Sequence, residues 1–181
     1  QDRLCRVAQG AYRLLAPPDW DGQSPLPSVL YFHGYGRSSK TVVDNGALVV
    51  AIHNAGAALI VPDGRNNTWA HVGSPSSARD DLAFIDAVMA DAASRLPLDK
   101  NRRYAAGFSQ GGSMAWDVAC YRGGDFAAFL PIAGAFWEPL PKHCAVPVNL
   151  RHVHGTSDPV VPMEGRAIRQ WRQGDVLKGL A

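Results

Sequence analysis

The sequence has no apolar run long enough to cross a membrane as a helix. Its longest strongly apolar stretches, residues 57–62 and 126–135, have the length of strands, whereas a membrane-spanning helix needs about 20 residues. It also has little excess charge: 18 Lys and Arg residues face 16 Asp and Glu residues, giving a net charge of +2. The basic residues form no run of the kind that marks a nucleic-acid-binding surface. We therefore expect neither a membrane nor a nucleic-acid partner.

An initiator methionine is also missing, and no apolar segment of a signal peptide follows Gln1. This pattern predicts a processed chain from which any signal peptide has been removed. The 181 residues, 46% of them apolar and 19% charged, have the size and composition of one folded domain. No repeat, low-complexity tract or linker divides the chain, so we expect a single domain over residues 1–181.

Cysteine is scarce, with three residues in the chain. Cys120 falls in a predicted helix and Cys144 just before a predicted strand, so a disulfide between them is geometrically reasonable. The alternative is two buried thiols, because free cysteine packs as a small hydrophobic residue. We predict the Cys120–Cys144 bridge, which leaves Cys5 unpaired.

Apolar runs that end at or near glycine alternate with helical patterns along the chain. The predicted strands are residues 12–16, 28–32, 58–61, 103–108, 127–132 and 148–153. The predicted helices are residues 80–96, 110–121 and 163–180, with Ser76 and Ser77 available to cap the first. Continuous apolar runs are typical of strands buried on both faces of a parallel sheet. The alternation therefore predicts an α/β fold with helices on both faces.

A glycine-flanked serine occupies the turn between one predicted strand and the next predicted helix, in Gly107-Phe108-Ser109-Gln110-Gly111. A serine hydroxyl attacks poorly unless it is exposed to substrate and a base removes its proton. A sharp strand-to-helix turn exposes the hydroxyl and requires glycine on both sides. Chance produces such a motif in roughly one chain in ten of this composition, but seldom with the strand and the helix in place. We predict that Ser109 is a catalytic nucleophile.

Backbone amides near this turn could stabilise an oxyanion. His33-Gly34-Tyr35-Gly36 follows an earlier predicted strand. In a hydrolase whose serine lies at a strand-to-helix turn, a loop in this position supplies one N–H donor. The start of the helix after the serine supplies the other donor. We predict an oxyanion hole formed by the amides of Tyr35 and Gln110.

An aspartate follows the last predicted strand, in His154-Gly155-Thr156-Ser157-Asp158-Pro159. The chain order of serine and then aspartate is the order of a hydrolase triad. The alternative is that Asp158 only caps the turn before Pro159. We predict that Asp158 is the triad acid.

Together these motifs resemble the secreted polyhydroxybutyrate depolymerase and feruloyl esterase-like branch of the α/β-hydrolases. The resemblance also covers Pro62-Asp63-Gly64 with nearby Trp69, and the Asp80-Asp81 start of a helix. It implies an α/β-hydrolase fold, ester hydrolysis through an acyl-serine, no metal or other cofactor, and a secreted or periplasmic protein. The implied substrates are hydroxyacid polyesters, or feruloyl and acetyl esters on plant polysaccharide.

One departure from the family pattern concerns the general base. The family's base histidine follows the aspartate, yet no histidine follows His154 in this sequence. Either the chain lacks a C-terminal helix and strand that carry the base, or it has lost the base. His71 is the one histidine on a loop that could face the catalytic edge, and we expect His33, His152 and His154 to be structural.

Two further assignments remain open at this point. Trp69 could line a substrate pocket, although a loop tryptophan more often serves packing. The chain could also be a binding module on a hydrolase scaffold, or an amidase or thioesterase with the same triad. The sequence does not decide between polyester, feruloyl and acetyl substrates, and it leaves the oligomeric state undetermined.

Overall fold

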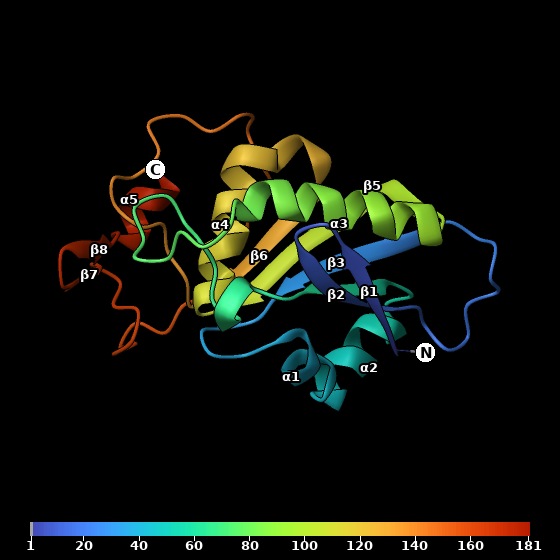
Figure 1. Ribbon diagram of the computed structural model, residues 1–181. Helices are drawn as coiled ribbons and strands as arrows, with labels where there is room; N and C mark the ends of the chain where they lie inside the picture. The colour runs from blue at the N-terminus through green and yellow to red at the C-terminus, as the bar shows by residue number, and fades with distance from the viewer. Residues whose placement is uncertain (1) are drawn as a thin grey trace.

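The computed structural model describes residues 2–181 and contains a central sheet between two layers of helices (Figure 1). The sheet has six strands in the order β1-β2-β4-β3-β5-β6. In chain order these strands are β1 (Asp2–Val7), β2 (Gly10–Leu15), β3 (Leu26–Phe32), β4 (Ala58–Pro62), β5 (Leu98–Phe108) and β6 (Ala128–Ile132).

Four strands of the sheet, β4, β3, β5 and β6, are parallel, and β2 and β1 extend the β4 side as antiparallel neighbours. Residues 149–153 continue the sheet beyond β6. Parallel bridges join Phe129 to Leu150 and Ile132 to Val153, and the Ala133 N–H donates to the Val153 carbonyl over 2.8 Å. The predicted α/β-hydrolase fold with a mostly parallel sheet is thereby confirmed.

Helices cover both faces of the sheet (Figure 1). The larger apolar core lies under α3 (Asp81–Arg95) and α4 (Gln110–Arg122). The short helices α1 (Ser39–Val43) and α2 (Gly46–Asn54) pack on the opposite face, over β3 and β4. No helix within residues 2–181 is long and apolar enough to span a membrane.

The α1–α2 face of the sheet is open over β5, β6 and the segment that follows β6. Tyr104, Leu130 and Val153 are 37%, 40% and 54% exposed there. A largely apolar hollow of about 370 Å³ runs over these strands to Ile52 of α2. Parallel sheets normally have both faces covered, so this open apolar surface is the least typical feature of the fold.

The C-terminal region differs from the prediction of one helix over residues 163–180. It forms a hairpin of β7 (Arg166–Ile168) and β8 (Trp171–Gln173), followed by the short helix α5 (Val176–Leu180). The hairpin is held in place by backbone pairing, because the Glu138 N–H donates to the Arg172 carbonyl and the Gly174 N–H donates to the Phe136 carbonyl. These hydrogen bonds to residues distant in sequence stabilise the hairpin, although the spacing of the apolar residues favours a helix.

Two smaller predictions concern α3 and the cysteines. The N-cap of α3 is Asp80, whose carboxylate accepts the Ala83 N–H, so the prediction that Ser76 or Ser77 caps this helix is wrong. The predicted disulfide is confirmed. It joins Cys120 of α4 to Cys144, while Cys5 is free and buried.

Candidate active site

Ser109 lies at the sharp turn between β5 and α4, as the sequence predicts. Its backbone has φ 57° and ψ −123°, a conformation that residues other than glycine rarely adopt. The turn is held by the Ser109 N–H, which donates to the Ile132 carbonyl over 2.9 Å. The hydroxyl makes no capping hydrogen bond to α4, so it is free to act on a substrate.

The glycines around Ser109 are required by close backbone contacts. A Cβ on Gly107 would overlap the Gly111 carbonyl, and a Cβ on Gly111 would overlap the Phe32 carbonyl at the end of β3. A Cβ on Gly112 would approach the Ile132 carbonyl of β6 to 2.5 Å. The start of α4 therefore lies directly against the ends of the neighbouring strands.

The two predicted oxyanion donors lie next to this turn. Gly34 is in contact with the turn, because a Cβ built on it would lie 3.7 Å from the Ser109 Cβ. The Gly36 N–H is used by the Asn67 carbonyl, whereas the Tyr35 N–H has no backbone acceptor within residues 2–181. The Gln110 N–H belongs to the first turn of α4, where amides have no partner inside the helix. Both amides are thus available to a negatively charged oxygen.

Trp69 packs against the segment of residues 33–36, which carries the predicted donor Tyr35. Its side chain is fully buried, packs edge-on against Phe32, and donates its indole N–H to the His33 carbonyl over 2.8 Å. The Gln110 side chain fixes the loop that carries Trp69, since its amide donates to the Thr68 hydroxyl over 2.7 Å. This burial gives no support to the predicted contact between Trp69 and substrate.

His33 is a structural residue in this arrangement. It is buried, its Nε2 accepts the Gly64 N–H over 2.9 Å, and its Nδ1 lies 2.9 Å from the Gly34 carbonyl. Burial lowers the pKa of the imidazole, which favours its neutral form. The ring therefore joins the segment of residues 33–36 to the turn at Gly64.

Asp158 lies at the same edge of the sheet as Ser109. Phe108, Ile132 and Val153 form one row across three parallel strands, and both candidate catalytic residues follow the ends of that row. Ser109 directly follows Phe108, and the loop that carries Asp158 begins after Val153, so both residues come from this edge of the sheet.

The Asp158 carboxylate is held by its own loop. Its Oδ1 accepts the N–H groups of Val160 and Val161 over 2.8 Å and 3.0 Å. The Val161 hydrogen bond is the main reason that the pKa of Asp158 is lowered, and the Val160 bond adds to it. Asp158 is thus a turn-forming residue, and its second oxygen lies 4.0 Å from His154 Nε2.

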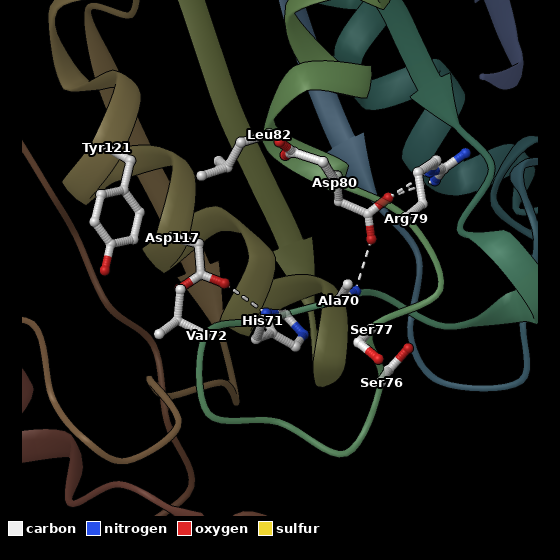
Figure 2. Close-up of a pocket in the computed structure, with 11 residues that line it drawn as sticks. Ala70, His71, Val72, Ser76, Ser77, Arg79, Asp80, Leu82, Asp117 and Tyr121 are labelled. Carbon is white, nitrogen blue, oxygen red and sulfur yellow. Dashed lines mark hydrogen bonds and ion pairs between the residues drawn. The ribbon is translucent and has the colours of Figure 1, made fainter. Parts of the chain in front are cut away.

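His71 lies in a different environment from the one expected of a substitute base. Its ring is buried, and its Nδ1 lies 2.6 Å from Asp117 Oδ2 on the flank of α4. Figure 2 shows this pair beside a cavity of about 290 Å³ between α4 and the start of α3. Ser109 does not line that cavity. No hydrogen bond within residues 2–181 joins a histidine to Ser109, and the prediction that His71 faces the catalytic edge is not supported.

Comparisons with known proteins agree with this geometry. The chain is 31% identical over 159 residues to a protein of Aspergillus niger named "Probable feruloyl esterase C", covering 85% of the chain and 57% of that relative. It is 30% identical over 162 residues to feruloyl esterase C of Emericella nidulans, with the same coverage. The crystal structure of a thermostable esterase superposes with a TM-score of 0.70 at 23% identity, covering 91% of this chain and 48% of that one. This chain has an α/β-hydrolase fold and is similar in sequence to feruloyl esterases.

No protein-family model matches the sequence of this α/β-hydrolase. The chain spans 57% of the length of the two feruloyl esterase relatives. The region shared with them nevertheless covers most of the hydrolase core described above, including the strands that carry Ser109 and Asp158.

Sequence reasoning missed an ion pair that holds the site of this α/β-hydrolase together. Arg79 and Asp81 form a buried ion pair with a 2.6 Å contact, and Asp81 also accepts the Ala70 N–H in the loop after Trp69. His152 and His154, which the sequence predicts to be structural, are hydrogen-bonded to each other. Their spacing along an extended segment places both on one face.

Proposed function

We propose that this chain provides the nucleophile, the oxyanion hole and the triad acid of a serine carboxylic-ester hydrolase. The observation that carries the proposal is Ser109 in its left-handed conformation between β5 and α4, near the backbone amides of Tyr35 and Gln110. This combination serves acyl transfer, which needs an exposed nucleophile and N–H donors directed at the developing oxyanion.

The proposed reaction has two halves. Ser109 Oγ attacks the ester carbonyl while a base takes its proton, and the Tyr35 and Gln110 amides stabilise the tetrahedral oxyanion. Collapse of this intermediate breaks the bond to the alcohol, which receives the proton from the base and leaves an acyl-serine. Water then attacks the acyl-serine with the help of the same base and releases the acid.

We propose that the base is a histidine from polypeptide outside these 181 residues, oriented by the free oxygen of Asp158. Two observations support this proposal. The chain spans 57% of its relatives, and the apolar face around Tyr104, Leu130 and Val153 is open next to the catalytic edge. A further amphipathic helix would cover that face and could bring the base to the row of strand ends. The domain would then be C-terminally incomplete as given.

The names of the relatives favour feruloyl esters as the substrate class, and acetyl esters or hydroxyacid polyesters are the alternatives. The Cys120–Cys144 disulfide supports a secreted or periplasmic location, since such bonds persist in oxidising compartments.

A substrate panel tests the proposed function. The chain, together with any polypeptide that its gene encodes after Ala181, is assayed with methyl ferulate, nitrophenyl acetate, a hydroxybutyrate oligomer and a nitroanilide. We expect ester cleavage with methyl ferulate preferred, no anilide cleavage, and a loss of at least about 10⁴-fold in kcat for Ser109→Ala. Ser94→Ala, an exposed serine on α3, is the matched control. Unchanged turnover in Ser109→Ala would refute the proposed nucleophile.

A second candidate function is a binding module without catalysis. The observation that favours it is the engagement of His33, His71, His152 and His154 in other contacts within residues 2–181. An extended chain that binds methyl ferulate without cleaving any ester would support this candidate.

A further inference from the structure

A chain of hydrogen bonds links the helix that begins after Ser109 to the loop that carries Asp158. Trp116 Nε1 of α4 lies 3.3 Å from His152 Nδ1, and His152 Nε2 lies 2.8 Å from His154 Nδ1. His154 Nε2 lies 2.6 Å from the Val161 carbonyl. The Trp116 and His154 side chains are each 3% exposed or less, so water has little access to the ends of this chain.

Both ends of this series of hydrogen bonds require the imidazole proton to lie on Nε2. An indole N–H can only donate, so His152 Nδ1 must accept and its proton lies on Nε2. A carbonyl can only accept, so His154 Nε2 must carry a proton and, in a neutral ring, its Nδ1 is the acceptor for His152. The two requirements meet without conflict only when both imidazoles are neutral and protonated on Nε2.

The series of hydrogen bonds ends at the backbone of Val161, which also binds the candidate triad acid Asp158. The Val161 carbonyl accepts from His154 Nε2, and the Val161 N–H donates to Asp158 Oδ1 over 3.0 Å. Fixing Val161 therefore fixes one oxygen of Asp158 and leaves the other available. Trp116, at the opposite end, belongs to the helix whose first turn adjoins Ser109.

We propose that His152 and His154 are positioning residues, which in their neutral Nε2-protonated form align Asp158 with the nucleophile helix. The proposal rests on the proposed function, because it assigns these histidines a role toward the triad acid. It makes no use of a proton transfer, and neither histidine contacts the substrate.

The surroundings of the pair keep it neutral. Burial and the neighbouring His154 lower the pKa of His152 to about 4, while the Pro131 carbonyl of β6 opposes that change. On the loop side the charged neighbour is Asp158, near which the Arg166 guanidinium also lies. A proton added to His152 would destroy the acceptor that Trp116 requires, so the chain of hydrogen bonds should persist down to about pH 5.

The proton arrangement is measured directly by long-range ¹H–¹⁵N NMR of the histidine side chains. At about pH 6 we expect His152 and His154 to be neutral with the proton on Nε2. Trp116→Phe keeps a large aromatic side chain but removes the donor, and it should shift the ¹⁵N resonance of His152 Nδ1. An Nδ1-protonated tautomer in either ring, or a charged His152 at this pH, would overturn the proposal.

The effect on Asp158 is measured by its carboxyl ¹³C resonance during a pH titration. His154→Phe retains a ring but removes both nitrogens, so the Val161 hydrogen bond should weaken and the pKa of Asp158 should rise toward its usual range. His143→Phe, at an exposed histidine, should leave that pKa unchanged. If His154→Phe folds and leaves the Asp158 titration unaltered, the histidines do not position the acid.

His152→Phe is a second variant in case His154→Phe fails to fold. It removes the donor to His154 Nδ1 and should shift the ¹⁵N resonance of that nitrogen, while the proton stays on Nε2 against the Val161 carbonyl. An unchanged Nδ1 resonance would contradict the proposal. None of these measurements needs turnover. A failure of the positioning role can therefore be told apart from a failure of the esterase proposal, which the substrate panel tests separately.

Discussion

Ser109 is held in a backbone conformation that costs about 1–3 kcal/mol for a residue other than glycine. Its N–H bonds the Ile132 carbonyl, and its carbonyl accepts the Ser113 N–H over 3.0 Å as α4 begins. The strain persists because these contacts and the packed glycines leave no room for relaxation. Such strain is concentrated at functional sites, which agrees with the role proposed for Ser109.

Gly111→Ala tests this packing at the scale of one residue. Alanine normally stabilises a helix relative to glycine, but here its Cβ would overlap the Phe32 carbonyl. We expect the free energy of unfolding in urea to fall by about 1–3 kcal/mol, because β3 and α4 must separate. Gly124→Ala, where a Cβ meets nothing within 4 Å, is the control, and equal stability of the two variants would contradict the packing argument.

The disulfide connects α4 to the segment that leads into the last sheet strand. Cys120 and Cys144 are 24 residues apart in sequence, and closing a loop of that size in the unfolded chain is worth about 3 kcal/mol. We expect a reductant to lower the free energy of unfolding by this amount in urea titrations. Cys5→Ala should respond to the reductant as the parent chain does, because Cys5 is not bridged. No effect of the reductant would show that the bridge contributes nothing.

At the scale of elements, the sequence was informative wherever a strand is buried and ends at the catalytic edge. Four strands have bounds within three residues of the prediction, namely β3, β4, β6 and, at its C-terminal end, β5. They could be predicted because continuous apolar runs and glycines mark them. The region 163–180 was misread as a helix because its pairing partners, Phe136 and Glu138, lie far away in sequence. No local pattern contains that information.

The site residues also differ in whether a local sequence pattern predicts their positions. The turn at Ser109 could be predicted because the glycines around it are a local steric requirement. The buried positions of Trp69 and His71 could not, since their partners Phe32, His33 and Asp117 depend on how the loop after β4 folds back over the sheet. The sequence placed Trp69 and His71 in one loop but did not indicate which residues their side chains contact.

The whole molecule has a well-packed core under α3 and α4 and an open apolar surface on the opposite face. The open surface adjoins the row of strand ends at Phe108, Ile132 and Val153, where the proposed base has to lie. We therefore propose that the same additional polypeptide covers the open face of the sheet and supplies the histidine of the triad. Without the base, the Ser109 hydroxyl remains protonated and seldom attacks, so residues 1–181 alone should show negligible esterase activity.

The most direct test is covalent labelling of Ser109 by a fluorophosphonate, read by mass spectrometry of the peptide that contains the adduct. In the chain extended beyond Ala181 we expect a single adduct on Ser109, absent from Ser109→Ala. Residues 1–181 alone should label far more slowly. An extended, folded chain that forms no adduct, or forms it on another residue, would contradict the account. Rapid labelling of residues 1–181 alone would instead show that the base lies within this chain.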